Sequence, residues 1–251
     1  MQPRAPRPPA VGNRRGDERG GSTRTVQRAL DLLLAAAGGS DSTPRARTLS
    51  ALARATGLPA ATASRLLSTL VARGLLRRDT DGAYRPGSGL TQLAALVLRD
   101  DPLYELAWPH LQQLALDTGE TASLGIAVDG DRALYLRQAA GEQRVQATAW
   151  TGRTIPRSGT AMGAALAGDV EATGWVARRR AIEPDVTAVA APVRGGGGEI
   201  VAALTILAPS YRTGDDEITV AGRLLAAHAG ELSAALGAPG EERTTDHRRA
   251  M

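Results

Sequence analysis

The spacing of apolar residues changes its period along the chain. Apolar residues recur every three or four positions within residues 25–37 and 49–72, which is typical of amphipathic helices. From Thr121 the period falls to two over several short segments, which is typical of strands. The pattern therefore predicts a helical N-terminal part, followed by a part in which helices and strands mix.

Residues 49–85 follow the order helix, glycine, helix, glycine, hairpin. Gly57 suits the left-handed residue that ends a first helix, and Pro59 suits the opening position of a second helix. Gly74 ends that second helix, and the Asp-Gly pair after it favours a tight reversal between two short strands. This order is typical of a winged helix-turn-helix.

The outer face of the second helix carries no Asp or Glu, whereas a merely solvated face usually mixes both charge signs. A helical wheel places an apolar stripe inward, made of Ala63, Leu66, Leu67 and Leu70. The small, hydroxylated outer face suits the DNA major groove, and the hairpin arginines suit phosphates. The predicted DNA-binding residues are Arg28, Ala61, Thr62, Ser64, Arg65, Ser68, Thr69, Arg77, Arg78 and Arg85. The alternative is an ordinary helical hairpin with a polar outer face.

The remaining elements follow from the same periods. We expect helices over residues 25–37, 90–99, 103–118, 159–167, 171–180 and 215–236. We expect strands over residues 121–128, 132–138, 144–150, 186–193 and 199–207, with an Asp129-Gly130 turn between the first two. The inward residues of the first helix should be Val26, Ala29, Leu30, Leu33 and Leu34. The apolar stripe of helix 90–99 should contribute to a dimer contact.

The predicted fold class is α+β, with an N-terminal winged helix-turn-helix domain before an antiparallel sheet flanked by helices. The expected parts are a disordered tail at 1–22, a DNA-binding domain at 23–88, a linker helix at 89–101, a second domain at 102–237 and a disordered tail at 238–251.

Composition and charge support two different modules. The chain has 251 residues, enough for two ordinary domains, and with 3% aromatic residues and no Phe its core must use Ala, Leu and Val. Residues 1–90 carry 15 Arg and 6 acidic residues, whereas residues 91–251 carry 15 Arg and 20 acidic residues. A basic N-terminal third fits a module that meets phosphate, joined to one that does not.

The sequence offers little catalytic chemistry. The absence of Cys excludes disulfides and Cys-bound metals, and fits a reducing compartment. No apolar run nears the roughly 20 residues that span a bilayer, and the Pro/Arg-rich N-terminus is no signal peptide, so we expect a cytoplasmic protein. His110, His228 and His247 lack the spacing of a metal or catalytic site. We therefore expect no enzyme, no catalytic residue, no cofactor, no metal and no membrane partner.

Two other segments invite a ligand-binding interpretation. The four glycines at 195–198 join two strand-like segments, so they predict a hairpin rather than a phosphate loop. Residues 156–161 enter a helix with small and hydroxylated residues. They either hold an anion on free backbone N–H groups or only cap the helix.

In order and spacing, these segments resemble the IclR family of bacterial transcriptional regulators from about Thr25 to Leu236. TVQRALDLL resembles the family's opening helix, LARATGLPAATASRLLSTLVARGLL its helix-turn-helix and YRPG its wing exit. PHLQQLALDTGETASLGI resembles the start of its effector domain, and SGTAMGAAL and VAAPVRGGGGEIVAALTILAP resemble its later signatures.

The resemblance implies a sequence-specific transcriptional regulator controlled by a small-molecule effector, commonly an organic acid. It implies double-stranded operator DNA as partner, a homodimer that is often a dimer of dimers, and a GAF-like effector-binding domain at the C-terminus. In the family the pocket lies at the segment matching 158–161 and at two late strands. The effector-binding residues implied here are Ser158, Gly159, Thr160, Ala161, Ala188, Ala190, Thr205 and Leu207.

The chemistry of those residues favours a mostly apolar carboxylic acid. Its carboxylate is expected at the helix start, where Ser158 and Thr160 add hydroxyl donors. No arginine is expected inside the pocket, and Arg153 and Arg157 are expected at its mouth.

Two other classes stay open. The first is a small-molecule-modifying enzyme, such as a methyltransferase, with a winged-helix dimerisation module. It requires a glycine-rich cofactor loop between a strand and a helix, which the sequence does not show. The second is a protein-interaction module with a degenerate winged helix, which the acid-free helix face disfavours.

Overall fold

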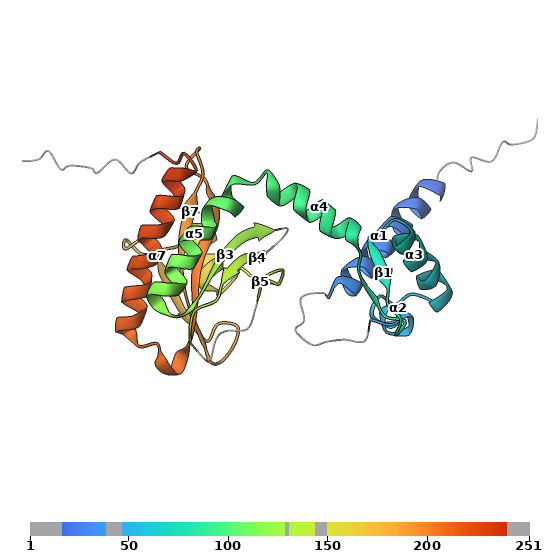
Figure 1. Cartoon of the computed structure of the whole chain (residues 1–251), viewed down its shortest axis with the longest axis horizontal. Coiled ribbons are helices and arrows are strands. Elements are labelled where there is room, and N and C mark those ends of the chain that lie inside the picture. The colour runs from blue at the N-terminus through green and yellow to red at the C-terminus, as the bar shows by residue number, and fades with distance from the viewer. Residues whose placement is uncertain (1–16, 39–46, 129–130, 144–149, 240–251) are drawn as a thin grey trace, which may run out of the picture. The chain divides into compact units, whose positions relative to one another are not determined.

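The computed structural model describes residues 17–38, 47–128, 131–143 and 150–239, with the backbone only at 17–22 (Figure 1). The chain divides into two compact units, Met1–Leu96 and Val97–Met251. Several predictions lie wholly or partly outside the described residues: residues 144–149 of the strand expected at 144–150, the Asp129-Gly130 turn, residues 1–16 of the first tail and residues 240–251 of the second.

The N-terminal unit is a winged helix-turn-helix. It contains α1 (Asp17–Ala37), α2 (Leu49–Ala55), α3 (Ala60–Ala72), β1 (Leu76–Arg78), β2 (Tyr84–Pro86) and most of α4 (Ser88–Arg99). β1 and β2 pair antiparallel, with Arg77 opposite Arg85. Gly57 and Gly74 have φ of 66° and 70°, so each supplies the left-handed residue after a helix, as predicted.

The core of this unit lies between the helices and the wing. Leu32 of α1, Leu67 of α3 and Leu76 of β1 are almost completely buried. The stripe predicted for α3, with Ala63, Leu66, Leu67 and Leu70, is buried as expected. Thr48 caps α2, because its Oγ1 accepts a hydrogen bond from the Ala51 N–H at 3.4 Å.

Helix α1 differs from its prediction in length and in face. It begins at Asp17, so the prediction of a disordered tail is wrong for residues 17–22. Val26, Leu30 and Leu34 are 56%, 50% and 65% exposed, whereas the buried residues are Leu32 and Ala36. Residues 29–37 are all apolar except Asp31, so their pattern does not predict which face of the helix is buried. Packing against α3 determines the buried face.

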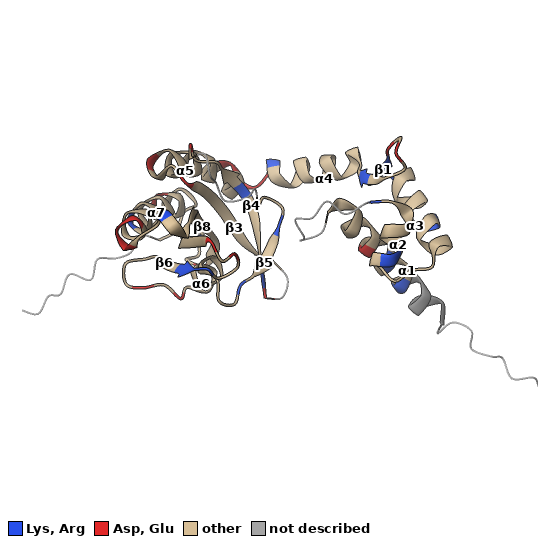
Figure 2. Ribbon diagram, turned by 90° about the horizontal axis from the view of Figure 1, so that it is seen from below, with Lys and Arg blue, Asp and Glu red and all other residues tan. Residues whose placement is uncertain are grey.

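In the part of the chain that the structure describes, the C-terminal unit is a six-stranded antiparallel sheet in the order β5-β4-β3-β8-β7-β6. The strands are β3 (Thr121–Val128), β4 (Arg132–Ala139), β5 (Thr154–Pro156), β6 (Val176–Arg179), β7 (Val186–Arg194) and β8 (Ile200–Pro209). The helices α5 (Pro102–Thr118) and α7 (Asp215–Ala235) cover one face, and α6 (Ala161–Ala167) covers the other (Figure 2). The predicted α+β class is confirmed.

Alternate residues of the central strands point to opposite faces of the sheet and pack into two separate hydrophobic cores. On β8, Leu204 and Ile206 pack against the α5–α7 side, whereas Ala203 and Leu207 pack on the α6 side. The two faces of the sheet therefore have different surroundings, one formed by α5 and α7 and the other by α6.

Two predicted elements of this unit are wrong. Residues 171–180, expected as a helix, form a turn and then β6, which pairs with β7. Gly174 has φ of 83°, which breaks a helix there, and pairing at the sheet edge fixes the rest as a strand. Residues 154–156, expected within a loop, pair with β4 as the edge strand β5. The hairpin predicted at the glycines 195–198 is confirmed between β7 and β8.

The same substitution at two glycines of α7 should have opposite effects. A Cβ on Gly222 would lie 2.3 Å from the ring of Trp175, whereas a Cβ on Gly230 would meet nothing within 4 Å. Gly222→Ala should lower the free energy of unfolding by about 1–3 kcal/mol through overpacking. Gly230→Ala should raise it by about 0.5–1 kcal/mol, because alanine loses less backbone entropy in a helix. Urea unfolding measures both, and equal stability of the two variants would contradict the packing.

Candidate nucleic-acid interface and ligand pocket

The outer face of α3 is open to solvent and free of carboxylates. Its exposed residues include Ala61, Arg65, Ser68 and Thr69, and its half-buried ones include Thr62 and Ser64. Thr69 Oγ1 donates to the carbonyl of Arg65 at 3.1 Å, so this hydroxyl is engaged by its own helix. The face offers one guanidinium and several small residues, with no acidic group to repel phosphate.

The wing carries two carboxylates beside the predicted DNA-contact arginines, Arg77, Arg78 and Arg85. Asp79 forms ion pairs with both Arg77 and Arg85. Asp81 lies 3.7 Å from Arg85. Arg78 instead lies over the ring of Tyr84, 5.7 Å from its centroid, and has no carboxylate partner among the described residues. The positive charge of the wing is therefore most available at Arg78.

All predicted DNA-binding residues lie in the N-terminal unit. Arg28 is exposed on α1, the helix whose inner side packs against α3. Figure 2 shows the basic residues of this unit on its helices and wing, with acidic residues at the tip of the wing. The fold thus presents one helix face and one hairpin, each with basic groups, on a single compact body.

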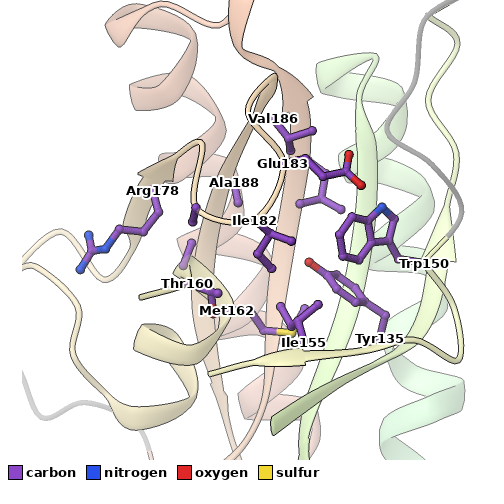
Figure 3. A pocket seen from close by; sticks show the side chains of 13 residues that line it. Tyr135, Trp150, Ile155, Thr160, Met162, Arg178, Ile182, Glu183, Val186 and Ala188 are labelled. Carbon is purple, nitrogen blue, oxygen red and sulfur yellow. The ribbon is translucent and has the colours of Figure 1, made fainter. Parts of the chain in front are cut away.

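A pocket lies between the sheet and α6 in the C-terminal unit (Figure 3). Its cavity volume is about 30 Å³, whereas the empty space between the surrounding atoms is about 380 Å³ and includes open solvent. Four of the eight predicted effector residues line it: Thr160, Ala161, Ala188 and Leu207. The other lining residues are Tyr135, Trp150, Ile155, Met162, Arg178, Ala181, Ile182, Glu183 and Val186. The segment 181–183, between β6 and β7, thus forms one wall of the pocket.

The other four predicted effector residues do not line this pocket. Ser158 and Gly159 are exposed beside a neighbouring, more open hollow that Arg157 also lines. Ala190 and Thr205 face each other across β7 and β8 and are completely buried. The structure therefore separates the predicted set into a lining group, a surface group and a core group.

The start of α6 is capped by its own side chain. Thr160 is the N-cap, and its Oγ1 accepts from the Gly163 N–H at 3.0 Å. The Ser158 N–H donates to the carboxylate of Asp131 at 3.4 Å. Of the two interpretations open from sequence, the cap is the one that this geometry shows.

Buried polar atoms without a hydrogen-bond partner gather on the α6 side of the sheet. Among the described residues they are Thr121 Oγ1, Trp150 Nε1, Arg153 Nε and Thr205 Oγ1. Thr121 pairs with Leu207 and Thr205 pairs with Ala190, so both hydroxyls point to the same side as the pocket. Of these four residues only Trp150 lines the pocket, so its Nε1–H is the donor that a ligand there could satisfy.

An aromatic pair forms one end of the pocket. The rings of Tyr135 and Trp150 meet edge to face, with centroids 5.3 Å apart, and both side chains are buried. Burial raises the pKa of the Tyr135 phenol, so the group stays neutral and can donate a hydrogen bond. Sequence reasoning missed both residues, although in a chain with four Tyr, three Trp and no Phe each aromatic is a signal.

The arginines are placed differently from the prediction. Arg178 lines the pocket, where no arginine was expected, although its guanidinium points away from Trp150 (Figure 3). Arg153 is half-buried, with its guanidinium stacked 4.1 Å from the ring centroid of Trp150. Arg157 lies at the neighbouring hollow. The sequence pattern could not place Arg178 at the pocket, because it predicts a helix where the chain forms β6.

Within the described residues, no helix is both long enough and apolar enough to cross a membrane.

Comparisons with known proteins agree with this architecture. The IclR helix-turn-helix domain family matches residues 25–80, and the family "Bacterial transcriptional regulator IclR C-terminal" matches residues 95–169. The HTH-type transcriptional regulator BhcR of Paracoccus denitrificans is 26% identical, and the match covers 87% of this chain and 89% of BhcR. It is named as a regulator, which gives no support to the enzymatic alternative.

Solved structures show the same fold. An IclR transcriptional regulator from Silicibacter sp. TM1040 superposes with a TM-score of 0.70 at 24% identity, covering 86% of this chain and 97% of that one. An IclR homologue from Microbacterium hydrocarbonoxydans, solved with 4-hydroxybenzoate, has a TM-score of 0.68 at 22% identity and covers 84% and 98%. With both family matches in place along the sequence, the chain belongs to the IclR family of bacterial transcriptional regulators.

Proposed function

We propose that this regulator reads its operator through the outer face of α3. The guanidinium of Arg65 suits a guanine edge or a phosphate, and the hydroxyls of Thr62 and Ser64 suit phosphates and base edges. Ala61 and Ser68 are small enough to let the helix approach the groove closely. The observation that carries the proposal is this exposed face, on which no carboxylate opposes the phosphates.

The wing and α1 would add contacts to the DNA backbone. Arg78 has no acidic partner among the described residues, so it can meet a phosphate directly. Arg77 and Arg85 must exchange Asp79 for phosphate, which costs part of the gain. Arg28 would reach the backbone from α1. These backbone contacts would position α3 in the major groove, but they do not distinguish one base sequence from another.

The active form is a homodimer, so the operator carries two related half-sites. No residue of α4 is buried, and Leu93, Leu96 and Val97 are 54%, 47% and 70% exposed. The exposed Val26, Leu30 and Leu34 of α1 form a second stripe at helical spacing. Contiguous apolar stripes of this kind mark interaction sites, because a partner removes them from water.

Introducing two charges into the α4 stripe should break the dimer. Leu93→Glu with Val97→Glu would bury two unpaired carboxylates in the contact, which is strongly unfavourable. Light scattering at micromolar concentration should show a dimer for the unchanged chain and a monomer for this variant. Thr91→Glu with Ala95→Glu adds the same charge on the opposite side of the helix and should remain a dimer. A monomeric unchanged chain would contradict the proposal.

The effector would be a small, largely aromatic or apolar organic acid bound in the pocket between the sheet and α6. Ile155, Met162 and Leu207 offer an apolar wall, as ligand pockets generally do. The unpartnered Trp150 Nε1 and the neutral Tyr135 hydroxyl are donors for its polar end. The homologue from Microbacterium hydrocarbonoxydans, solved with 4-hydroxybenzoate, supports this class of ligand.

Effector binding would favour one arrangement of the DNA-binding units in the dimer and so change operator affinity, in the cytoplasm where the DNA lies. The test is a fluorescence-anisotropy titration of the upstream DNA of its own gene, with and without 4-hydroxybenzoate and related acids. An active effector should change the operator affinity by about 5- to 150-fold. If no acid of this class changed it, the effector assignment would be wrong.

A further inference from the structure

Two histidines far apart in sequence meet between α5 and α7. His110 of α5 and His228 of α7 are 118 residues apart, yet their Nδ1 atoms lie 2.9 Å from each other. Their rings meet at 76°, and both side chains are more than four-fifths buried. Glu231, one turn after His228, places Oε2 at 3.8 Å from His110 Nδ1 and 3.9 Å from His228 Nδ1. Three potential metal-ligand atoms thus converge on one point.

The size of this triangle is close to that of a zinc site. A point equidistant from the two nitrogens and the oxygen lies about 2.1 Å from each, which is the usual Zn–N and Zn–O distance. We propose that His110, His228 and Glu231 bind a divalent transition-metal ion of the zinc type. Three protein ligands leave a fourth position for water or for another donor.

The donor set also selects the class of ion. Two imidazoles and one carboxylate suit Zn²⁺, Co²⁺, Ni²⁺ or Cu²⁺, whereas Mg²⁺ and Ca²⁺ require oxygen ligands.

A hydrogen bond between the two rings accounts for less of the geometry. Two neutral imidazoles can share one proton along the 2.9 Å line, but Glu231 is then beyond hydrogen-bond distance of both nitrogens. A metal ion engages all three groups at once. Ligand atoms around tetrahedral zinc lie about 3.3 Å apart, so the two nitrogens would open slightly and Glu231 Oε2, on an exposed side chain, would move closer to both.

This site is separate from the effector pocket. α5 and α7 pack on one face of the sheet, whereas the pocket lies on the α6 face. An ion at this position would join α5 to α7, the two helices of that outer layer. Metal binding should therefore stabilise the C-terminal unit without occupying the place of an organic acid.

The test uses the full chain without an affinity tag, stripped of metal and titrated with Zn²⁺ by calorimetry. We expect one site per chain, no binding of Mg²⁺, and a rise in melting temperature with Zn²⁺. His110→Ala and His228→Ala should each weaken Zn²⁺ binding by about 100-fold or more. Glu231→Gln, at a solvent-exposed position, should weaken it by about 10-fold and leave the fold intact.

A charge-matched control and a spectrum separate this site from adventitious binding. Glu105→Gln removes an exposed carboxylate of α5 outside the cluster and should leave Zn²⁺ affinity unchanged. Co²⁺ should give the visible absorption of a four-coordinate site, and His228→Ala should abolish it. The proposal is overturned if the chain does not bind Zn²⁺ at micromolar concentration. It is equally overturned if His110→Ala, His228→Ala and Glu231→Gln all bind Zn²⁺ as the unchanged chain does.

Discussion

Replacing Arg65 by Ala weakens binding to the operator by about 1–3 kcal/mol, or roughly 5- to 150-fold, and relaxes base preference at one position in each half-site. The expectation rests on the α3 face, where Arg65 is exposed and is the helix's one arginine. If the guanidinium of Arg65 donates two hydrogen bonds to a guanine, no other side chain on this face of α3 can replace them. The loss should therefore be larger for the operator than for unrelated DNA.

The matched control removes the same charge elsewhere. Arg223 is exposed on α7 in the C-terminal unit, so Arg223→Ala should leave operator affinity and specificity unchanged. Anisotropy titrations against the operator and against single-base variants of it measure both quantities. If Arg65→Ala behaved like Arg223→Ala, α3 would not be the reading helix.

Filling the pocket should abolish the effector response and leave DNA binding intact. Ala188 lines the pocket from β7, and Ala188→Trp would place an indole in the space that an organic acid needs. The DNA-binding residues lie in the other unit, so operator affinity without effector should stay within about twofold. The measurement is operator affinity at a series of effector concentrations. In Ala188→Trp this affinity should no longer change with effector concentration.

Two further variants keep this prediction testable if Ala188→Trp folds poorly. Trp150→Phe retains an aromatic ring but removes the unpartnered Nε1–H, and it should weaken effector binding by roughly 5- to 100-fold. Ala234→Trp makes the same alanine-to-tryptophan change on the exposed side of α7 and should retain the full response. A full response in Ala188→Trp, with the chain folded, would place the effector elsewhere.

The sequence predicted the winged helix-turn-helix well because its signals are local. Gly57, Gly74 and the α3 stripe lie within one short stretch, and each restricts the backbone or the buried face by itself. The face of α1 could not be predicted, because nearly every residue after Leu30 is apolar. Only contact with α3 decides which of them are buried.

The elements that failed depend on distant partners. β6 (Val176–Arg179) is an edge strand that forms because it pairs with β7. A segment of four residues is too short for its apolar period to distinguish a strand from one turn of a helix. The polar end of the pocket combines Tyr135 with Trp150, which lie on different segments. His110 and His228 meet through the packing of α5 on α7, so their spacing in sequence carried no signal.

The central claim is that the N-terminal unit binds a specific operator through phosphate and base contacts. The most direct measurement is the affinity of the full chain for the upstream DNA of its own gene, and for a shuffled sequence of equal length, between 50 and 200 mM salt. We expect log affinity to fall linearly with log salt for both DNAs, as counterions are released, and the upstream DNA to bind about 10³-fold or more tightly than the shuffled one. Equal affinity for the two DNAs, or an affinity that does not change with salt, would contradict it.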